Sequence, residues 1–508
     1  MAMLWIVLAV VLVLLALLVT YSRRASGDYD VVVVGGGSAG LTAAGIAASV
    51  GARTLLVERD RLGGECTWTG CIPSKALLKA ASVAHSMRTA SKYGLDAVEP
   101  KVDLARVLEQ VRGVQAHIYR DADAPEVISK LGVEVSSGRA RFVSHDELEI
   151  VEAEQVRRVR FRDAIICTGT RARVPDVPGL DAVPFVTNET VFSLPSLPRR
   201  LLVLGAGPIG VELAQAFSRL GSAVTVVDRE QEILPKDAPE LAAIVRERLE
   251  AEGVRFRLDA SLARVDRRGE EIHAVLAGSK DVFVVDALLV AIGRVANIEG
   301  LGLDVAGVTT NEHGIPVDAR CRTSNRRIYA CGDVTGRPQF THYAEHMAKV
   351  AVANAALGIP LRLERAVVPW VTFTDPELAH VGSRELDASR HQLYRFPYAK
   401  LDRAVAEQND AGVIHVQTDR RGRIIAANVV GASAGEVIAE LVLAMKQHVP
   451  LGKITDTIHA YPTLALGARR VADQWYVQNT PVALLRAVIA LRGLRGRAPT
   501  RPKPGEIV

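Results

Sequence analysis

Two cysteines five positions apart, Cys66 and Cys71, have the spacing and surroundings of a redox pair. Helix-forming residues follow directly at 76–81, which predicts that Cys71 lies near a helix N-terminus, where free amides and the helix dipole favour a thiolate. The chain of 508 residues has only five cysteines, which excludes a disulfide scaffold. The other three are interpreted as buried or incidental thiols: Cys167, Cys321 and Cys331. Taken alone, the pair fits either a redox-active disulfide or a structural one.

Two glycine-rich turns predict two dinucleotide-binding folds. Each follows an apolar stretch, at residues 31–34 and 201–204, and each opens a predicted helix whose N-terminus suits a pyrophosphate. The residues of the two turns are Gly35, Gly37, Ser38, Ala39 and Gly40 in the first and Gly205, Gly207 and Gly210 in the second. An acid follows the next predicted strand in both cases, Glu58 and Asp228, 23 positions beyond the first glycine, where it can bind a ribose hydroxyl. We therefore predict two Rossmann-like folds in an α/β chain.

Asp228 favours NADH as the nicotinamide nucleotide. Its carboxylate accepts a hydrogen bond from a 2′-hydroxyl and repels a 2′-phosphate. Arg229, next to it, leaves NADPH open.

The run from Gly63 to Lys75, Gly-Gly-Glu-Cys-Thr-Trp-Thr-Gly-Cys-Ile-Pro-Ser-Lys, resembles the active-site segment of the class I pyridine nucleotide-disulfide oxidoreductases. This family includes dihydrolipoamide dehydrogenase, glutathione reductase and mercuric reductase, and the resemblance covers residues 29–477. It implies an enzyme with FAD in the first fold and a nicotinamide nucleotide in the second. It also implies that Cys71 faces the flavin, that Cys66 is the interchange thiol, and that Lys75 lies beside the flavin ring with Glu212 as its partner.

The resemblance extends to the crossings between domains. Thr168 and Gly169 match the crossing into the nicotinamide domain, Gly293 matches the return, and Gly332 and Asp333 match a second FAD strand whose acid binds the ribityl chain. The resemblance implies an FAD domain at 29–172 and 295–365, a nicotinamide domain at 173–294 and an α+β dimerisation domain at 366–477. Outside the resemblance, the sequence predicts an anchor at 1–21, a linker at 22–28 and a basic tail at 478–508. The dimerisation domain implies a homodimer.

The resemblance fails at the family's acid/base pair. Dihydrolipoamide and glutathione reductases carry a His and, five residues later, a Glu, where this chain has Tyr461 and Leu466. A phenol titrates near pH 10 and is a poor base for releasing a thiol from a disulfide. His459 is interpreted as a surface or core histidine, with a displaced base as the alternative. A tyrosine at this position resembles the mercuric-reductase branch of the family most.

The electron acceptor stays open at this stage. The branch's C-terminal vicinal cysteines and N-terminal Cys-x-x-Cys domain are absent from the sequence, so no metal-binding residues are assigned. Three acceptor classes remain: a metal ion such as Hg(II) or Cu(II), a disulfide, and a quinone reduced directly by the flavin. A low-turnover flavin and disulfide redox sensor is the alternative of a different class.

The two ends of the chain predict a membrane association. Residues 1–21 carry no charge, and 4–19 are apolar throughout, long enough for a bilayer-spanning helix. Arg23 and Arg24 then place the catalytic domains in the cytoplasm, with the chain in the inner membrane. Residues 481–508 hold six Lys or Arg and one Glu, which accounts for the net charge of +5. This tail is interpreted as either a membrane-surface helix or a packed or frayed end, and nothing indicates nucleic acid binding.

Overall fold

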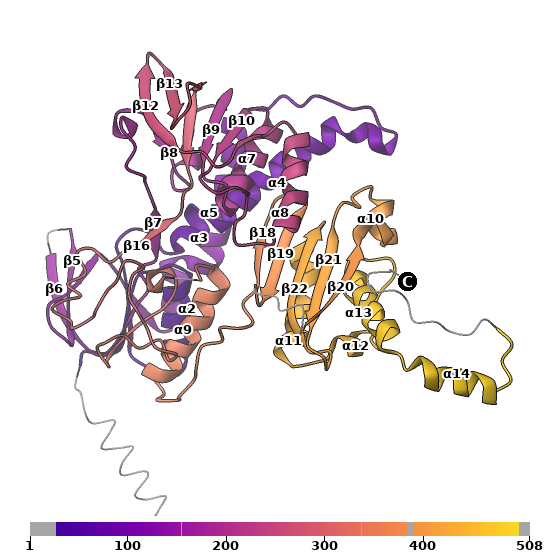
Figure 1. Ribbon diagram of the computed structural model, residues 1–508. Helices are drawn as coiled ribbons and strands as arrows, with labels where there is room; N and C mark the ends of the chain where they lie inside the picture. The colour runs from indigo at the N-terminus through magenta and orange to yellow at the C-terminus, as the bar shows by residue number, and fades with distance from the viewer. Residues whose placement is uncertain (1–26, 154, 337, 385–390, 497–508) are drawn as a thin grey trace, which may run out of the picture. The chain divides into compact units, whose positions relative to one another are not determined.

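The computed structural model describes residues 27–153, 155–336, 338–384 and 391–496 (Figure 1). These residues form two compact units. Unit 1 contains the described residues up to Pro73 together with Arg112–Arg171 and Arg294–Leu363. Unit 2 contains Ser74–Val111, Ala172–Gly293 and the described residues from Glu364 onward.

Unit 1 is built on a seven-stranded sheet in the order β3-β2-β1-β6-β5-β4, with β17 also paired to β6. Its strands are β1 Tyr29–Val34, β2 Thr54–Glu58, β3 Val133–Ser137, β4 Arg139–Phe142, β5 Glu147–Glu152, β6 Gln155–Ile166 and β17 Ile328–Ala330. The second half of β6 pairs parallel with β1 and β17, whereas its first half pairs antiparallel with β5. The valine run of β1 is almost wholly buried, as expected of a parallel strand covered on both faces.

Small residues bring two helices of unit 1 together. α2 is rich in alanine and glycine and lies beside α9 (Figure 1). The helices of this unit are α2 Ser38–Ser49, α3 Gly64–Trp68, α6 Pro125–Lys130 and α9 Thr341–Ala355. Two longer helices have residues in both units, α4 Cys71–Arg88 and α5 Leu104–Ile118, and the short strands β7 Thr170–Ala172 and β16 Arg294–Ala296 pair with each other.

Unit 2 contains a second parallel sheet in the order β11-β10-β9-β15-β8. Its strands are β8 Phe185–Val186, β9 Arg200–Leu204, β10 Ala223–Val227, β11 Arg255–Arg257 and β15 Ala287–Val290. The helices that follow β9 and β10 are α7 Pro208–Leu220 and α8 Pro239–Ala251, and an antiparallel sheet is formed by β12 Leu262–Arg268, β13 Glu271–Leu276 and β14 Val282–Val285. The β9–α7 turn therefore repeats the β1–α2 turn of unit 1.

The C-terminal part of unit 2 is an antiparallel sheet in the order β18-β19-β22-β21-β20. The strands are β18 Trp370–Thr372, β19 Glu377–Gly382, β20 Gln392–Pro397, β21 Val413–Thr418 and β22 Ile424–Gly431. Its helices are α10 Asp402–Ala406, α11 Ala434–Lys446, α12 Leu451–Ile454, α13 Leu466–Asn479 and α14 Val482–Leu491. The predicted α/β architecture agrees with these elements, while the exact domain boundaries stay a prediction.

The predicted transmembrane helix and the inner-membrane location are wrong for the part of the chain that the structure describes. No helix there is both long and apolar enough to cross a bilayer. The apolar helix α14 has 10 residues, about 15 Å, against a hydrocarbon core of about 30 Å. Residues 1–21, on which the prediction was based, lie outside the described residues.

Candidate active site and nucleotide loops

The two cysteines lie on consecutive helices of unit 1. Cys66 is in the short helix α3, and Cys71 is the first residue of α4. The Cys71 Sγ lies 3.3 Å from the Thr341 Oγ1, at the first residue of α9. Hydrogen bonding with Cys71, and burial after it, raise the pKa of Cys66, whereas hydrogen bonds with Thr341 and Ser38 oppose the rise. Two thiols and two hydroxyls thus meet at one place, which is suited to dithiol and disulfide chemistry.

An ion pair anchors the residue beside Cys66. Glu65 accepts two hydrogen bonds from the Arg294 guanidinium, whose side chain is only 10% exposed. The Arg294 Nε donates to the Thr170 Oγ1 at 2.7 Å and lies 4.0 Å from the Asp333 Oδ2. Burial raises the pKa of Asp333, and Arg294 and Thr170 oppose this. The predicted ribityl-binding acid and the thiol segment are therefore linked through one arginine.

The first glycine-rich turn joins β1 to α2. Gly35 has φ +103°, and a Cβ there would lie 2.5 Å from the Cys167 carbonyl oxygen, so a side chain is excluded. A Cβ on Gly37, the N-cap of α2, would meet only the Gly64 Cα at 3.8 Å. Glu58 accepts hydrogen bonds from the Gly36 amide and, at 2.8 Å, from the Asp60 amide.

The second turn, in unit 2, has the same glycine conformation and the same bracing carboxylate. Gly205 has φ +113° and lies against the Ala291 carbonyl, while a Cβ on Gly207 would meet no atom within 4 Å. Asp228 accepts hydrogen bonds from the Ala206 amide and, at 2.9 Å, from the Glu230 amide. Each acid therefore accepts one hydrogen bond from the backbone amide in the middle of its glycine turn and one from the amide two residues after the acid.

The residues of both turns fit a dinucleotide. The middle glycine leaves the helix N-terminus open to a close backbone approach, as a pyrophosphate requires. A carboxylate fixed by backbone amides stands at the end of the neighbouring strand, where a ribose hydroxyl can donate to it.

Lys75 and Glu212, predicted to pair, do so within unit 2. The Lys75 Nζ donates to the Glu212 Oε2 at 3.0 Å and lies 4.2 Å from the centre of the Phe373 ring. The Glu212 Oε1 accepts the Phe373 amide at 2.9 Å. One turn further along α7, Gln215 both donates to and accepts from the backbone of Asp375. The 370–376 segment thus helps to hold the lysine–glutamate pair.

Tyr461 and His459 have distinct surroundings in unit 2. Tyr461 is 68% exposed, and its hydroxyl donates to the Asp402 Oδ2 at 2.8 Å, which raises the pKa of the phenol. The His459 side chain is 8% exposed; its Nδ1 faces the Thr457 carbonyl at 3.0 Å and its Nε2 faces the Glu440 carboxylate at 2.9 Å. Both ring nitrogens of His459 are therefore engaged, which disfavours its use as a displaced base.

Comparison with known proteins decides the family. Residues 29–348 match the model of the pyridine nucleotide-disulphide oxidoreductases, and residues 368–470 match the dimerisation domain of the same family. The chain belongs to this family. It is an oxidoreductase of the FAD-dependent kind that uses NAD(P)H, and its dimerisation domain supports a homodimer.

The relatives of the oxidoreductase include proteins named for different activities. A mercuric reductase of Bacillus cereus is 32% identical over 89% of this chain and 72% of its own length. Dihydrolipoyl dehydrogenase 2 of Haloarcula marismortui is 35% identical over 87% of this chain and 96% of its own length. The Cu(II) complex of the HOCl-induced flavoprotein disulfide reductase RclA from Escherichia coli has a TM-score of 0.77 and 27% identity, covering 88% of this chain and 99% of that one.

Sequence reasoning missed several residues of this oxidoreductase's candidate site. Thr341 lies 270 positions from Cys71, and no local pattern connects the two. Arg294 directly follows Gly293 at the predicted crossing, and a cation at that turn is the only feature of the sequence that indicates its ion pair with Glu65. Phe373 belongs to the run Trp-Val-Thr-Phe-Thr-Asp-Pro-Glu at 370–377, whose pattern resembles the mercuric-reductase branch but does not indicate a contact with Lys75.

Proposed function

We propose that the chain transfers electrons from NADH to the Cys66–Cys71 pair and from this pair to a soft metal ion such as Hg(II) or Cu(II). The observation that carries the proposal is the clustering of both thiols with the Thr341 hydroxyl at the N-terminus of α4. The N-terminus of α4 and the Thr341 hydroxyl favour a thiolate at Cys71, whereas the neighbouring thiol and burial raise the pKa of Cys66. Thiolates are the ligands that soft cations prefer, so the metal would bind as the Cys66 proton leaves.

The residues of the chain have separate tasks in this proposal. When bound, FAD supplies the two-electron chemistry that connects the nicotinamide with the thiols. Glu58 and Asp333 would hold FAD with the first turn, assisted by Thr168, Gly169 and Gly332. Gly205, Gly207, Gly210 and Asp228 would hold NADH, near Gly293. The Lys75 side chain, which is paired with Glu212, would stabilise negative charge that develops near its Nζ atom.

The metal acceptor is favoured over a disulfide by the residues at the family's acid/base position. Tyr461 is a weaker acid than an ordinary phenol because Asp402 accepts its proton in a hydrogen bond and raises its pKa. Leu466 is buried and does not titrate. A soft cation bound by two thiolates needs no proton delivered to a leaving thiol, whereas a disulfide substrate does.

A panel of acceptors tests the proposal. Steady-state NADH oxidation by the FAD-loaded protein is measured with Hg(II), Cu(II), lipoamide, glutathione disulfide and a quinone. We expect metal turnover to exceed disulfide turnover by about 100-fold or more, the usual contribution of general acid/base catalysis. Cys66→Ser should abolish metal turnover, while Cys321→Ser, at a buried cysteine of unit 1, should not.

Three outcomes contradict the proposal. Fast disulfide turnover that Tyr461→Phe leaves unchanged would show that the acid/base role is filled elsewhere. Quinone turnover retained in Cys66→Ser would favour direct use of the flavin. Reduction by one equivalent of NADH without turnover on any acceptor would favour a redox sensor.

A further inference from the structure

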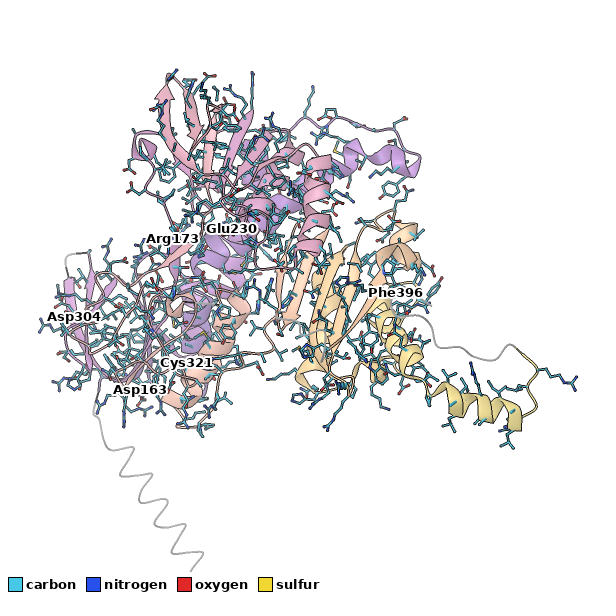
Figure 2. The ribbon with its side chains drawn as sticks, viewed as in Figure 1. Asp163, Arg173, Glu230, Asp304, Cys321 and Phe396 are labelled. Atoms are coloured by element: carbon cyan, nitrogen blue, oxygen red, sulfur yellow. The ribbon has the colours of Figure 1, made fainter. Side chains whose placement is uncertain are left out.

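Unit 1 contains a second pair of cysteines, separate from Cys66 and Cys71. Cys167 directly follows β6 and Cys331 directly follows β17, and their side chains are buried, with 5% and 0% exposure. The two Sγ atoms lie 3.3 Å apart, within hydrogen-bonding distance for thiols. Cys321, labelled in Figure 2, is also fully buried, but its Sγ faces the Met347 carbonyl oxygen at 3.5 Å.

The strand register brings Cys167 and Cys331 together. β6 and β17 are parallel neighbours in which Ile166 pairs with Ala330, so the two cysteines occupy the next matching positions. The Cys331 amide donates to the Ile166 carbonyl at 3.0 Å, which continues the ladder to this point. Neighbouring strands are about 4.8 Å apart, within the Cα separation of about 4.4–6.8 Å that disulfides span. The sulfur atoms need approach by only about 1.2 Å to reach the disulfide bond length of about 2.05 Å.

The pair lies directly behind the first glycine-rich turn. The Cys167 amide donates to the Val34 carbonyl at 2.7 Å, and the Cys167 carbonyl oxygen lies 2.5 Å from the position that a Cβ on Gly35 would take. Gly332, next to Cys331, is packed so that a Cβ there would lie 3.1 Å from the Ala39 Cβ in the helix that the turn opens. The residues that follow the two cysteines, Thr168 and Asp333 among them, are those proposed to hold FAD.

We propose that Cys167 and Cys331 form a second dithiol–disulfide couple, which crosslinks the ends of β6 and β17 behind the nucleotide turn. The oxidant is a hydroperoxide. One thiol sulfur, as thiolate, attacks the terminal oxygen, the O–O bond breaks, and an alcohol, or water from hydrogen peroxide, leaves with the proton. The second sulfur then displaces water from the sulfenic acid. In total two thiols lose two electrons and two protons, and one peroxide bond is reduced.

The surroundings assign the order of the two steps. Cys167 is the thiol with residual exposure, so it meets the oxidant first. Hydrogen bonding with Cys167 and complete burial raise the pKa of Cys331, which keeps Cys331 protonated until the sulfenic acid forms beside it. Because both sulfurs are buried, oxidation requires local opening of the turn and is slower than oxidation of the Cys66–Cys71 pair.

Peptide mapping of the FAD-loaded protein tests this inference. Hydrogen peroxide is applied, removed with catalase, and the remaining thiols are alkylated in denaturant before digestion without reductant. We expect a Cys167–Cys331 crosslinked peptide that dithiothreitol cleaves, with Cys321 still fully alkylated. Cys321→Ser should form the same crosslink, and in Cys167→Ser the Cys331 thiol should stay alkylatable. The mapping is also done in a Cys66→Ser/Cys71→Ser background, where no other couple can exchange with this pair.

The inference is overturned if Cys167 and Cys331 both remain alkylatable at a peroxide dose and time several-fold beyond those that oxidise the Cys66–Cys71 pair completely. It is also overturned if Cys167 advances to sulfinic or sulfonic acid without a crosslink, or if Cys321 is the partner found. A readout independent of activity accompanies the mapping. The crosslinked protein should release FAD at a higher urea concentration than its dithiothreitol-treated form, and Cys167→Ser should show no such difference.

Discussion

Asp228→Asn is the sharpest test of the proposed preference for NADH, because the structure defines the task of each carboxylate oxygen. One oxygen accepts the Ala206 amide and the other accepts the Glu230 amide at 2.9 Å. Asparagine has nearly the same shape, but it presents an NH₂ group where the second oxygen was. One of the two backbone amides therefore loses its acceptor, and the negative charge disappears.

The loss of charge acts on both nucleotides: the ribose hydroxyl of NADH loses a charged acceptor, and the 2′-phosphate of NADPH loses a repelling carboxylate. Both effects narrow the NADH:NADPH ratio of kcat/KM. A hydrogen bond to a charged group contributes about 1.5–3 kcal/mol, so kcat/KM for NADH should fall about 10- to 150-fold. A carboxylate about 5 Å from a 2′-phosphate charge costs about 1–3 kcal/mol, and its removal should offset much of the loss for NADPH. The NADH:NADPH ratio of kcat/KM should therefore narrow by about tenfold or more.

The assay measures kcat/KM for each nucleotide at one fixed acceptor concentration, with FAD content determined for every preparation. Glu58→Gln is the matched control, because Glu58 braces Gly36 and Asp60 in the first turn as Asp228 braces the second. It should weaken FAD retention and leave the nucleotide ratio unchanged. A wild-type preference for NADPH, or an unchanged ratio in Asp228→Asn, would refute the reasoning.

Three further substitutions test other parts of unit 2. Arg219→Met leaves the Glu252 carboxylate, which is 7% exposed, without its bidentate partner. The free energy of unfolding, measured in urea, should fall by about 3–5 kcal/mol. The control Arg200→Met, at an exposed ion pair, should change it little. His415 is buried, and burial lowers its pKa from 6.5 to about 4. The folded state therefore binds fewer protons than the unfolded state, and stability falls as the pH drops through this window. The urea midpoint should fall more between pH 7 and pH 4.5 in the wild type than in His415→Gln, and equal falls would contradict this. Glu212→Gln removes the charge on the acceptor of a 3.0 Å hydrogen bond and should slow anaerobic flavin reduction by NADH about tenfold or more with unchanged nucleotide affinity; an unchanged rate would remove the pair from the mechanism.

The parts of the site that the sequence predicted are those whose geometry is local. Gly35 and Gly205 must adopt positive φ, and only glycine does so without strain, so the residue type records the backbone conformation. Glu58 is the last residue of β2 and Asp228 directly follows β10, and the parallel pairing of these strands with β1 and β9 brings the strand ends to one edge. The pattern therefore contained nearly all the information needed for the two turns.

The parts that the sequence did not reveal depend on contacts between distant segments. Thr341 reaches Cys71, and Arg294 reaches Glu65, only because the sheet of unit 1 collects segments that are 229 to 270 positions apart. A threonine at the start of a helix and an arginine after a strand are common in any chain, so neither residue type indicates a role. The Cys167–Cys331 pair was overlooked for the same reason, since its cysteines meet only through the pairing of β6 with β17.

The acceptor question shows how far a residue type alone can mislead. His459 lies two residues before Tyr461, which occupies the family's acid/base position, and an imidazole suits a proton carrier better than a phenol does. In the structure, however, the Thr457 carbonyl and the Glu440 carboxylate contact the two ring nitrogens, and the side chain is 8% exposed, so both nitrogens face groups of the protein and not a substrate. Tyr461 is 68% exposed and shares its proton with Asp402. Tyr461 is therefore the side chain of the two that can meet a substrate. Its phenol can bind and orient a substrate but exchanges protons poorly at neutral pH. This favours an electron acceptor that is held by thiolates over one that must be protonated.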